Sequence, residues 1–179
     1  TIELINDITA TTVIELGKSI TINGNDHKVT SSATRVFRVT KSNVEVTLNK
    51  VNMVSSAVRV GQNDVRGIAI DPALENVKLT LNDCSVDFTD PSANDWTYAV
   101  NVAGNGTGHE VTVNGGTYEG ANVINVYGAN NTIVVKDATL NSMYPNNDVY
   151  YGSCIWVLQN QGSSVEAAGN TFNGNNAIA

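Results

Sequence analysis

The chain has 179 residues, of which 41% are hydrophobic and 15% charged, with 10 Lys and Arg against 17 Asp and Glu. This length suits a single domain with a sizeable core, and the low charged fraction excludes a chain kept disordered by its charge. No apolar run is long enough for a membrane helix, and the segment after Thr1 lacks the pattern of a secretory signal peptide, so we expect no membrane insertion.

The charge is unevenly distributed. Residues 79–179 carry one basic side chain, Lys136, against nine acids. Such a surface repels phosphate backbones and anionic lipids, so we expect no nucleic-acid partner. The 25 Asn, 24 Val, 18 Thr and 15 Gly favour many short strands joined by turns over helices.

A repeat runs along the chain. The pattern apolar-Thr-apolar-Asn occurs at 20–23, 46–49, 79–82 and 111–114, and degenerate copies follow at 133–136 and 165–168. The fourth position of each copy, called the marker here, therefore lies at residues 23, 49, 82, 114, 136 and 168. Four positions after the marker every copy has a large or apolar residue: His27, Met53, Val86, Tyr118, Leu140 and Phe172.

A second strand with period-two alternation precedes most copies. These strands are predicted at 37–39, 68–70, 100–102, 124–126 and 155–157. A unit of two or three short strands cannot bury its apolar face alone, whereas stacked units can. We therefore predict an all-β chain, with residues 1–179 forming one parallel β-helix domain of about six coils. Ile22, Leu48, Leu81, Val113 and Val135 should form one inward column.

The Asn residues at the marker suit a corner between a strand and a turn, because Asn tolerates left-handed backbone. Stacked on successive coils, Asn23, Asn49, Asn82 and Asn114 are also expected to form a ladder of amide hydrogen bonds. Cys84 and Cys154 lie about three coils apart in this scheme, too far for a disulfide, so we expect two free thiols.

The stretch Lys18-Ser-Ile-Thr-Ile-Asn-Gly-Asn-Asp-His-Lys-Val29, with the opening Ile2-Glu-Leu-Ile-Asn-Asp-Ile8, resembles the first coil of right-handed parallel β-helix proteins, the pectate-lyase-like superfold. The resemblance is to repeat proteins of the secreted or bacterial surface type, and it implies a right-handed helix but no particular activity. Residues 172–179 restart the pattern of 118–125. We therefore expect either a solenoid truncated at this end, or an open edge that a cap or another chain covers, self-association included.

Loops lengthen on one side of the predicted solenoid, at 54–66, 87–97 and 141–153. Insertions on one face of a solenoid often carry its binding site. Trp156 is expected to point outward, because its register mates include Asn101 and Asn125. The predicted ligand-binding set is Trp96, Tyr144, Tyr150, Tyr151, Trp156, Asp87, Asp95, Asp148, Asn101 and Asn125. Exposed aromatics among carboxylates and amides are typical of sugar-binding surfaces. The alternative is that these aromatics pack the loops or lie in an oligomer contact.

Metal and catalytic signals are weak. Asp83, Asp87, Asp90 and Asp95 offer oxygen ligands for Ca²⁺, but their spacing fits no EF-hand loop, so no metal or other cofactor is predicted and Ca²⁺ stays an alternative. Asp87 with Asp95 or Asp148 could supply paired carboxylates. No motif demands that chemistry, and the catalytic residues stay unknown.

The leading hypothesis is a non-enzymatic extracellular or cell-surface module, adhesin-like or carbohydrate-binding, whose partner is a polysaccharide or a cell-surface glycan. One alternative is a polysaccharide lyase or glycoside hydrolase of the pectate-lyase-like superfold. A purely structural solenoid segment is the other.

Overall fold

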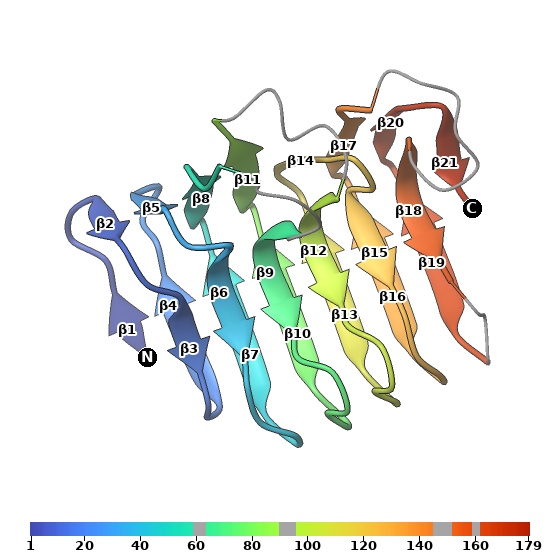
Figure 1. Cartoon of the computed structure of the whole chain (residues 1–179), viewed down its shortest axis with the longest axis horizontal. Coiled ribbons are helices and arrows are strands. Elements are labelled where there is room, and N and C mark those ends of the chain that lie inside the picture. The colour runs from blue at the N-terminus through green and yellow to red at the C-terminus, as the bar shows by residue number, and fades with distance from the viewer. Residues whose placement is uncertain (59–63, 90–95, 145–151, 159–161) are drawn as a thin grey trace.

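The chain folds into a stack of coils, each with three short strands around one core (Figure 1). The structure is a computed structural model that describes residues 1–58, 64–89, 96–144, 152–158 and 162–179. These residues form three sheets of seven strands, and each strand pairs in parallel with its counterpart on the next coil. They contain no helix, and therefore none that could cross a membrane.

The strands are named by sheet. Sheet A contains β1 (Ile2–Glu3), β4 (Ile20–Asn23), β7 (Glu45–Asn49), β10 (Lys78–Asn82), β13 (Glu110–Asn114), β16 (Thr132–Lys136) and β19 (Ser164–Ala168). Sheet B contains β2 (Ile8–Ala10), β5 (Lys28–Ser31), β8 (Asn52–Ser55), β11 (Ser85–Phe88), β14 (Thr117–Gly120), β17 (Thr139–Ser142) and β20 (Thr171–Asn173). Sheet C contains β3 (Ile14–Leu16), β6 (Arg35–Val39), β9 (Val65–Ile70), β12 (Thr97–Val102), β15 (Ile124–Val126), β18 (Ser153–Val157) and β21 (Asn176–Ile178).

The predicted parallel β-helix is confirmed, with about seven coils rather than six. The additional coil is the first one, formed by β1, β2 and β3. Its strands are only two or three residues long, and Glu3 stands where the later coils have the marker. The repeat pattern missed this coil because it has no apolar-Thr-apolar-Asn segment.

The core is built from inward columns that run across the coils. In sheet A, Ile22, Leu48, Leu81, Val113 and Val135 are Cα partners on consecutive strands, as predicted, and none is more than 5% exposed. Stacking succeeds because parallel strands place equivalent residues about 4.8 Å apart, so each apolar side chain packs on its counterparts.

The amide ladder is also confirmed. The Nδ2 of Asn49 donates to Asn23, that of Asn82 to Asn49, and that of Asn114 to Asn82, at 2.8, 2.7 and 2.9 Å. The left-handed backbone, however, lies one residue later than expected, for example at Lys50 with φ 49°. The marker itself is the last residue of its strand, as it also is at Lys136 and Ala168, where the copy has no Asn.

The first corner differs from the others. Asn25 and Asp26 both have positive φ, so this turn is longer, and Val29 rather than His27 pairs with Met53 in sheet B. His27 therefore does not occupy the sheet B position that Met53 and its counterparts fill on the later coils. Its Nδ1 instead lies 3.4 Å from the Asp7 carboxylate.

The two cysteines are free and buried, as predicted. The long connections all lead from sheet B to sheet C: 56–64 joins β8 to β9, 89–96 joins β11 to β12, and 143–152 joins β17 to β18. All three connections therefore enter sheet C at the N-terminal ends of its strands.

Candidate functional site

The outer face of sheet C carries the most varied group of side chains among the described residues. Strand pairing aligns Glu15, Arg38, Ala69, Asn101, Asn125 and Trp156 in one column. The neighbouring residues Phe37, Ile68, Val100, Ile124 and Ile155 form an inward column and are buried. Period-two alternation thus turns Trp156 outward, as predicted.

Trp156 is half-buried and packs against Tyr127. The two ring centroids are 5.8 Å apart with an interplanar angle of 77°, an edge-to-face pair. Tyr127 was not among the predicted site residues. Alternation could have found it, because it follows the outward Asn125 by two positions. The pair presents two partly exposed rings on one surface.

Asn101 and Asn125 lie in the predicted column but are 2% and 0% exposed. The Nδ2 of Asn125 donates to the Oδ1 of Asn101 at 2.7 Å, so sheet C also has an amide–amide hydrogen bond between neighbouring coils. Their expected role as surface amides is therefore wrong for this structure. The exposure of these amides depends on larger side chains on the same face, such as Tyr127. The period-two pattern of a single strand does not show those neighbours. The Oδ1 of Asn125 is buried with no hydrogen-bond partner.

Charged side chains occupy the same face on the earlier coils. Arg66 is 9% exposed, forms an ion pair with Asp64, and lies with its guanidinium carbon 5.8 Å from the centre of the Tyr98 ring. Arg38 binds the two carboxylate oxygens of Asp71 through its Nε at 2.7 and 2.8 Å. Cationic and aromatic groups thus share one surface.

Tyr127 lies near both the aromatic Trp156 and the charged side chains of this face. Burial raises the pKa of its hydroxyl, the nearby Asp64 raises it further, and Arg66 and Asn125 act in the opposite direction. The hydroxyl therefore stays protonated at neutral pH and can both donate and accept a hydrogen bond.

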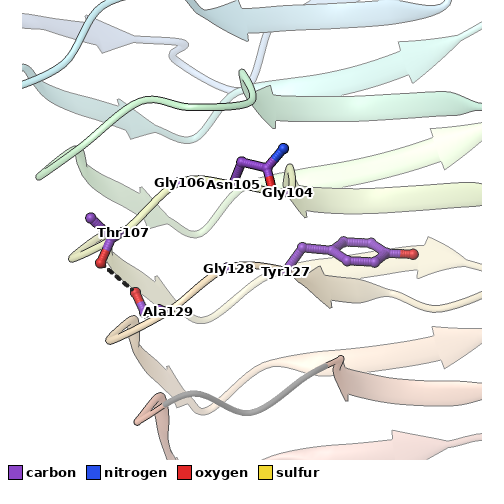
Figure 2. A pocket seen from close by; sticks show the side chains of 7 residues that line it. All are labelled: Gly104, Asn105, Gly106, Thr107, Tyr127, Gly128 and Ala129. Carbon is purple, nitrogen blue, oxygen red and sulfur yellow. Dashed lines mark hydrogen bonds between the residues drawn. The ribbon is translucent and has the colours of Figure 1, made fainter.

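A hollow of about 370 Å³ opens beside Tyr127 (Figure 2). Its lining consists of Gly104, Asn105, Gly106, Thr107, Tyr127, Gly128 and Ala129. Residues 127–131 connect β15 to β16, and this turn is shorter than the turn 103–109 on the preceding coil. The hollow lies where the two turns of unequal length meet. Figure 2 shows the Tyr127 ring extending away from the Thr107–Ala129 hydrogen bond, which measures 3.0 Å. Backbone groups and one aromatic ring form the wall.

Of the remaining predicted site residues, Asp87, Trp96 and Tyr144 lie in the part of the chain that the structure describes. Asp87 is a strand residue of β11 and is exposed on sheet B, so its predicted place beside Trp156 is wrong. Trp96 directly precedes β12 with φ 61°, Tyr144 follows β17, and both are half-buried. The other four, Asp95, Asp148, Tyr150 and Tyr151, lie outside the described residues.

Asp87 instead meets Glu119 of β14, which sequence reasoning had not singled out. The outward positions of β11, β14 and β17 stack here, so Asp87 and Asn141 lie on the two sides of Glu119. Burial, followed by the neighbouring Asp87, raises the pKa of Glu119. Within the described ranges, no three His, Cys, Asp or Glu side chains cluster as metal ligands.

Comparisons with protein-family models, with curated proteins and with solved structures found no match to this chain.

Proposed function

We propose that the chain is a non-enzymatic glycan-binding module of an extracellular or cell-surface protein, and that it binds a polysaccharide or cell-surface glycan along the outer face of sheet C. The observation that carries the proposal is the partly exposed Trp156–Tyr127 pair. Aromatic faces pack against the C–H patches of sugar rings, and Tyr and Trp do so at low entropic cost because they have few rotatable bonds.

The surroundings of the pair support the same ligand class. The hollow beside Tyr127 is lined by backbone groups that can bond sugar hydroxyls, and the Tyr127 hydroxyl both donates and accepts. Sheet C is also the sheet that the three long connections enter. Binding residues are concentrated on such connections when a rigid scaffold positions them.

The test is a glycan array of plant, host and bacterial oligosaccharides, read for binding and for released reducing or unsaturated ends, with and without calcium. We expect binding without products. Trp156→Ala should weaken the best ligand by at least about 2 kcal/mol, roughly 30-fold, as for a hot-spot aromatic. Thr80→Ala on the outer face of sheet A is the matched surface control and should leave affinity unchanged.

Two results would replace this proposal. Released sugar products would assign the chain to the lyases or hydrolases. Binding that is equally strong in the wild type and in Trp156→Ala would move the site away from sheet C.

A further inference from the structure

Among the described residues of the outer face of sheet C, Arg35 is a cation that forms no ion pair with a carboxylate. It begins β6 and is the Cα partner of Arg66 on β9, so two arginines stand on neighbouring coils. Like charges directly opposite each other on paired strands are destabilising. The next position in this column is Tyr98 on β12, which leaves the pair bordered by an aromatic ring.

The carboxylates of this region are already engaged. Asp71 and Glu15 pair with Arg38, and Asp64 pairs with Arg66. Arg35 donates from Nη1 to the Thr34 hydroxyl at 3.2 Å. In the part of the chain that the structure describes, no carboxylate lies within 4.0 Å of its guanidinium.

Burial lowers the pKa of Arg35, and the neighbouring Arg66 and Arg38 lower it further, while Asp71 and Asp64 attract it only from a distance. The guanidinium nevertheless stays charged, because an arginine does not lose its proton in a protein. In addition, the Nε of Arg66 is buried without an acceptor. Among the described residues of this face, Arg35 is therefore a positive charge without a paired carboxylate, opposite a second arginine, and an oxyanion would offset that charge.

We propose that Arg35, with Arg66 beside it and the Tyr98 ring at its border, is a binding site for an oxyanion group of the ligand, a carboxylate or a sulfate. This inference rests on the proposed glycan-binding function and specifies the ligand as an acidic glycan. Guanidinium groups bind planar carboxylates and tetrahedral oxyanions through two parallel hydrogen bonds.

The position of Arg35 fits a ligand that lies along the stack. From Arg38, on the same strand, to Trp156 the outward column crosses four coil steps, about 19 Å at the spacing of parallel strands. One extended glycan chain can thus place an acidic group at Arg35 and a sugar ring at Trp156. With a net charge of −7, the rest of the surface gives an anion little other attraction.

The test uses the whole chain and two matched sugars, sodium glucuronate and glucose, at constant ionic strength. The signal is the chemical shift of the arginine Nε–Hε groups by NMR, with sodium sulfate as a separate arm. We expect glucuronate to move the Arg35 signal and glucose to leave it in place. Arg35→Gln should weaken glucuronate binding about tenfold or more, the size of a lost charge-assisted hydrogen bond.

Lys18→Gln is the control, because it removes the same charge from an exposed position in the turn between β3 and β4. It should change glucuronate affinity less than twofold. Arg35→Gln should remain folded, because it removes a repulsion, and a thermal melt checks this.

The outcomes separate the two proposals. Equal losses in Arg35→Gln and Lys18→Gln would overturn the site in favour of general electrostatic attraction. Glycan binding that needs Trp156 and is unaffected by Arg35→Gln would overturn the site and keep the proposed function. Glucuronate binding at Arg35 with no glycan bound on the array would support the site and refute the proposed function. Sulfate binding tighter than glucuronate would support the site and identify a sulfated sugar as the ligand.

Discussion

Glu119 on β14 lies next to Asp87 on β11 on the outer face of sheet B, and burial together with this neighbouring carboxyl raises the pKa of Glu119. Residues 32 positions apart meet here because each coil places its outward side chains on those of the previous coil.

This pair predicts a pH dependence of stability. Because the pKa of Glu119 is raised in the folded state, that state binds more protons than the unfolded chain, and its stability falls as the pH rises through this pKa. Glu119→Gln should therefore raise the unfolding free energy at pH 7 by about 0.2–1 kcal/mol, the usual size of a like-charge cross-strand effect. Urea melts at pH 4 and pH 7 measure it, and the gain should be absent at pH 4.

Asp87→Asn provides the control for that experiment. Either substitution alone removes the repulsion, so the double variant should gain less than the sum of the two single gains. Additive gains would show that the two carboxyl groups do not interact.

We expect Asn82 to contribute more to the free energy of unfolding than Asn114, because of its place in the amide ladder. Asn82 donates to Asn49 and accepts from Asn114, whereas a single ladder bond joins Asn114 to its neighbour. At about 0.5–1.5 kcal/mol for each bond, Asn82→Ala should cost about 1–3 kcal/mol and Asn114→Ala about half of that. Equal costs in denaturant melts would mean that the ladder bonds contribute little.

The edge-to-face contact between Tyr127 and Trp156 should be measurable without any ligand. A double-mutant cycle with Trp156→Ala and Tyr127→Ala is expected to give a coupling energy of about 0.5–1.5 kcal/mol. Because both rings are half-buried, Trp156→Ala should cost less than the 3–5 kcal/mol of a core aromatic. A loss in that higher range, or no coupling, would place Trp156 in a different environment.

Cys84 should be unreactive in the folded chain. Burial raises its pKa to about 11, so at pH 8 nearly all of it is the neutral thiol, and its side chain is 0% exposed. A disulfide reagent should label it only as fast as the protein unfolds, and should count two thiols in denaturant because Cys154 is also free. Rapid labelling of Cys84 in native buffer would contradict this placement.

The sequence by itself determined the repeat. Four apolar-Thr-apolar-Asn segments and the period-two strands predicted which residues point inward, and the predicted columns through Leu48 and Leu81 are those of the core. The amide ladder followed from the same register. These features are local. The alternation within a strand of five residues shows which of its faces is apolar, and the recurrence of the pattern along the chain indicates that these apolar faces stack on one another.

The tertiary structure decided everything that depends on two coils at once. In the folded chain Asn101 and Asn125 are buried, and Tyr127 packs against Trp156. Asp87 lies on sheet B, next to Glu119. The tertiary structure also placed Arg35 opposite Arg66 without a carboxylate of its own in the described chain. The pattern could not reveal these relationships because coil lengths vary, so the partner of each outward residue is set by how the turns close. Its exposure is then set by the size of the side chains on the neighbouring coils.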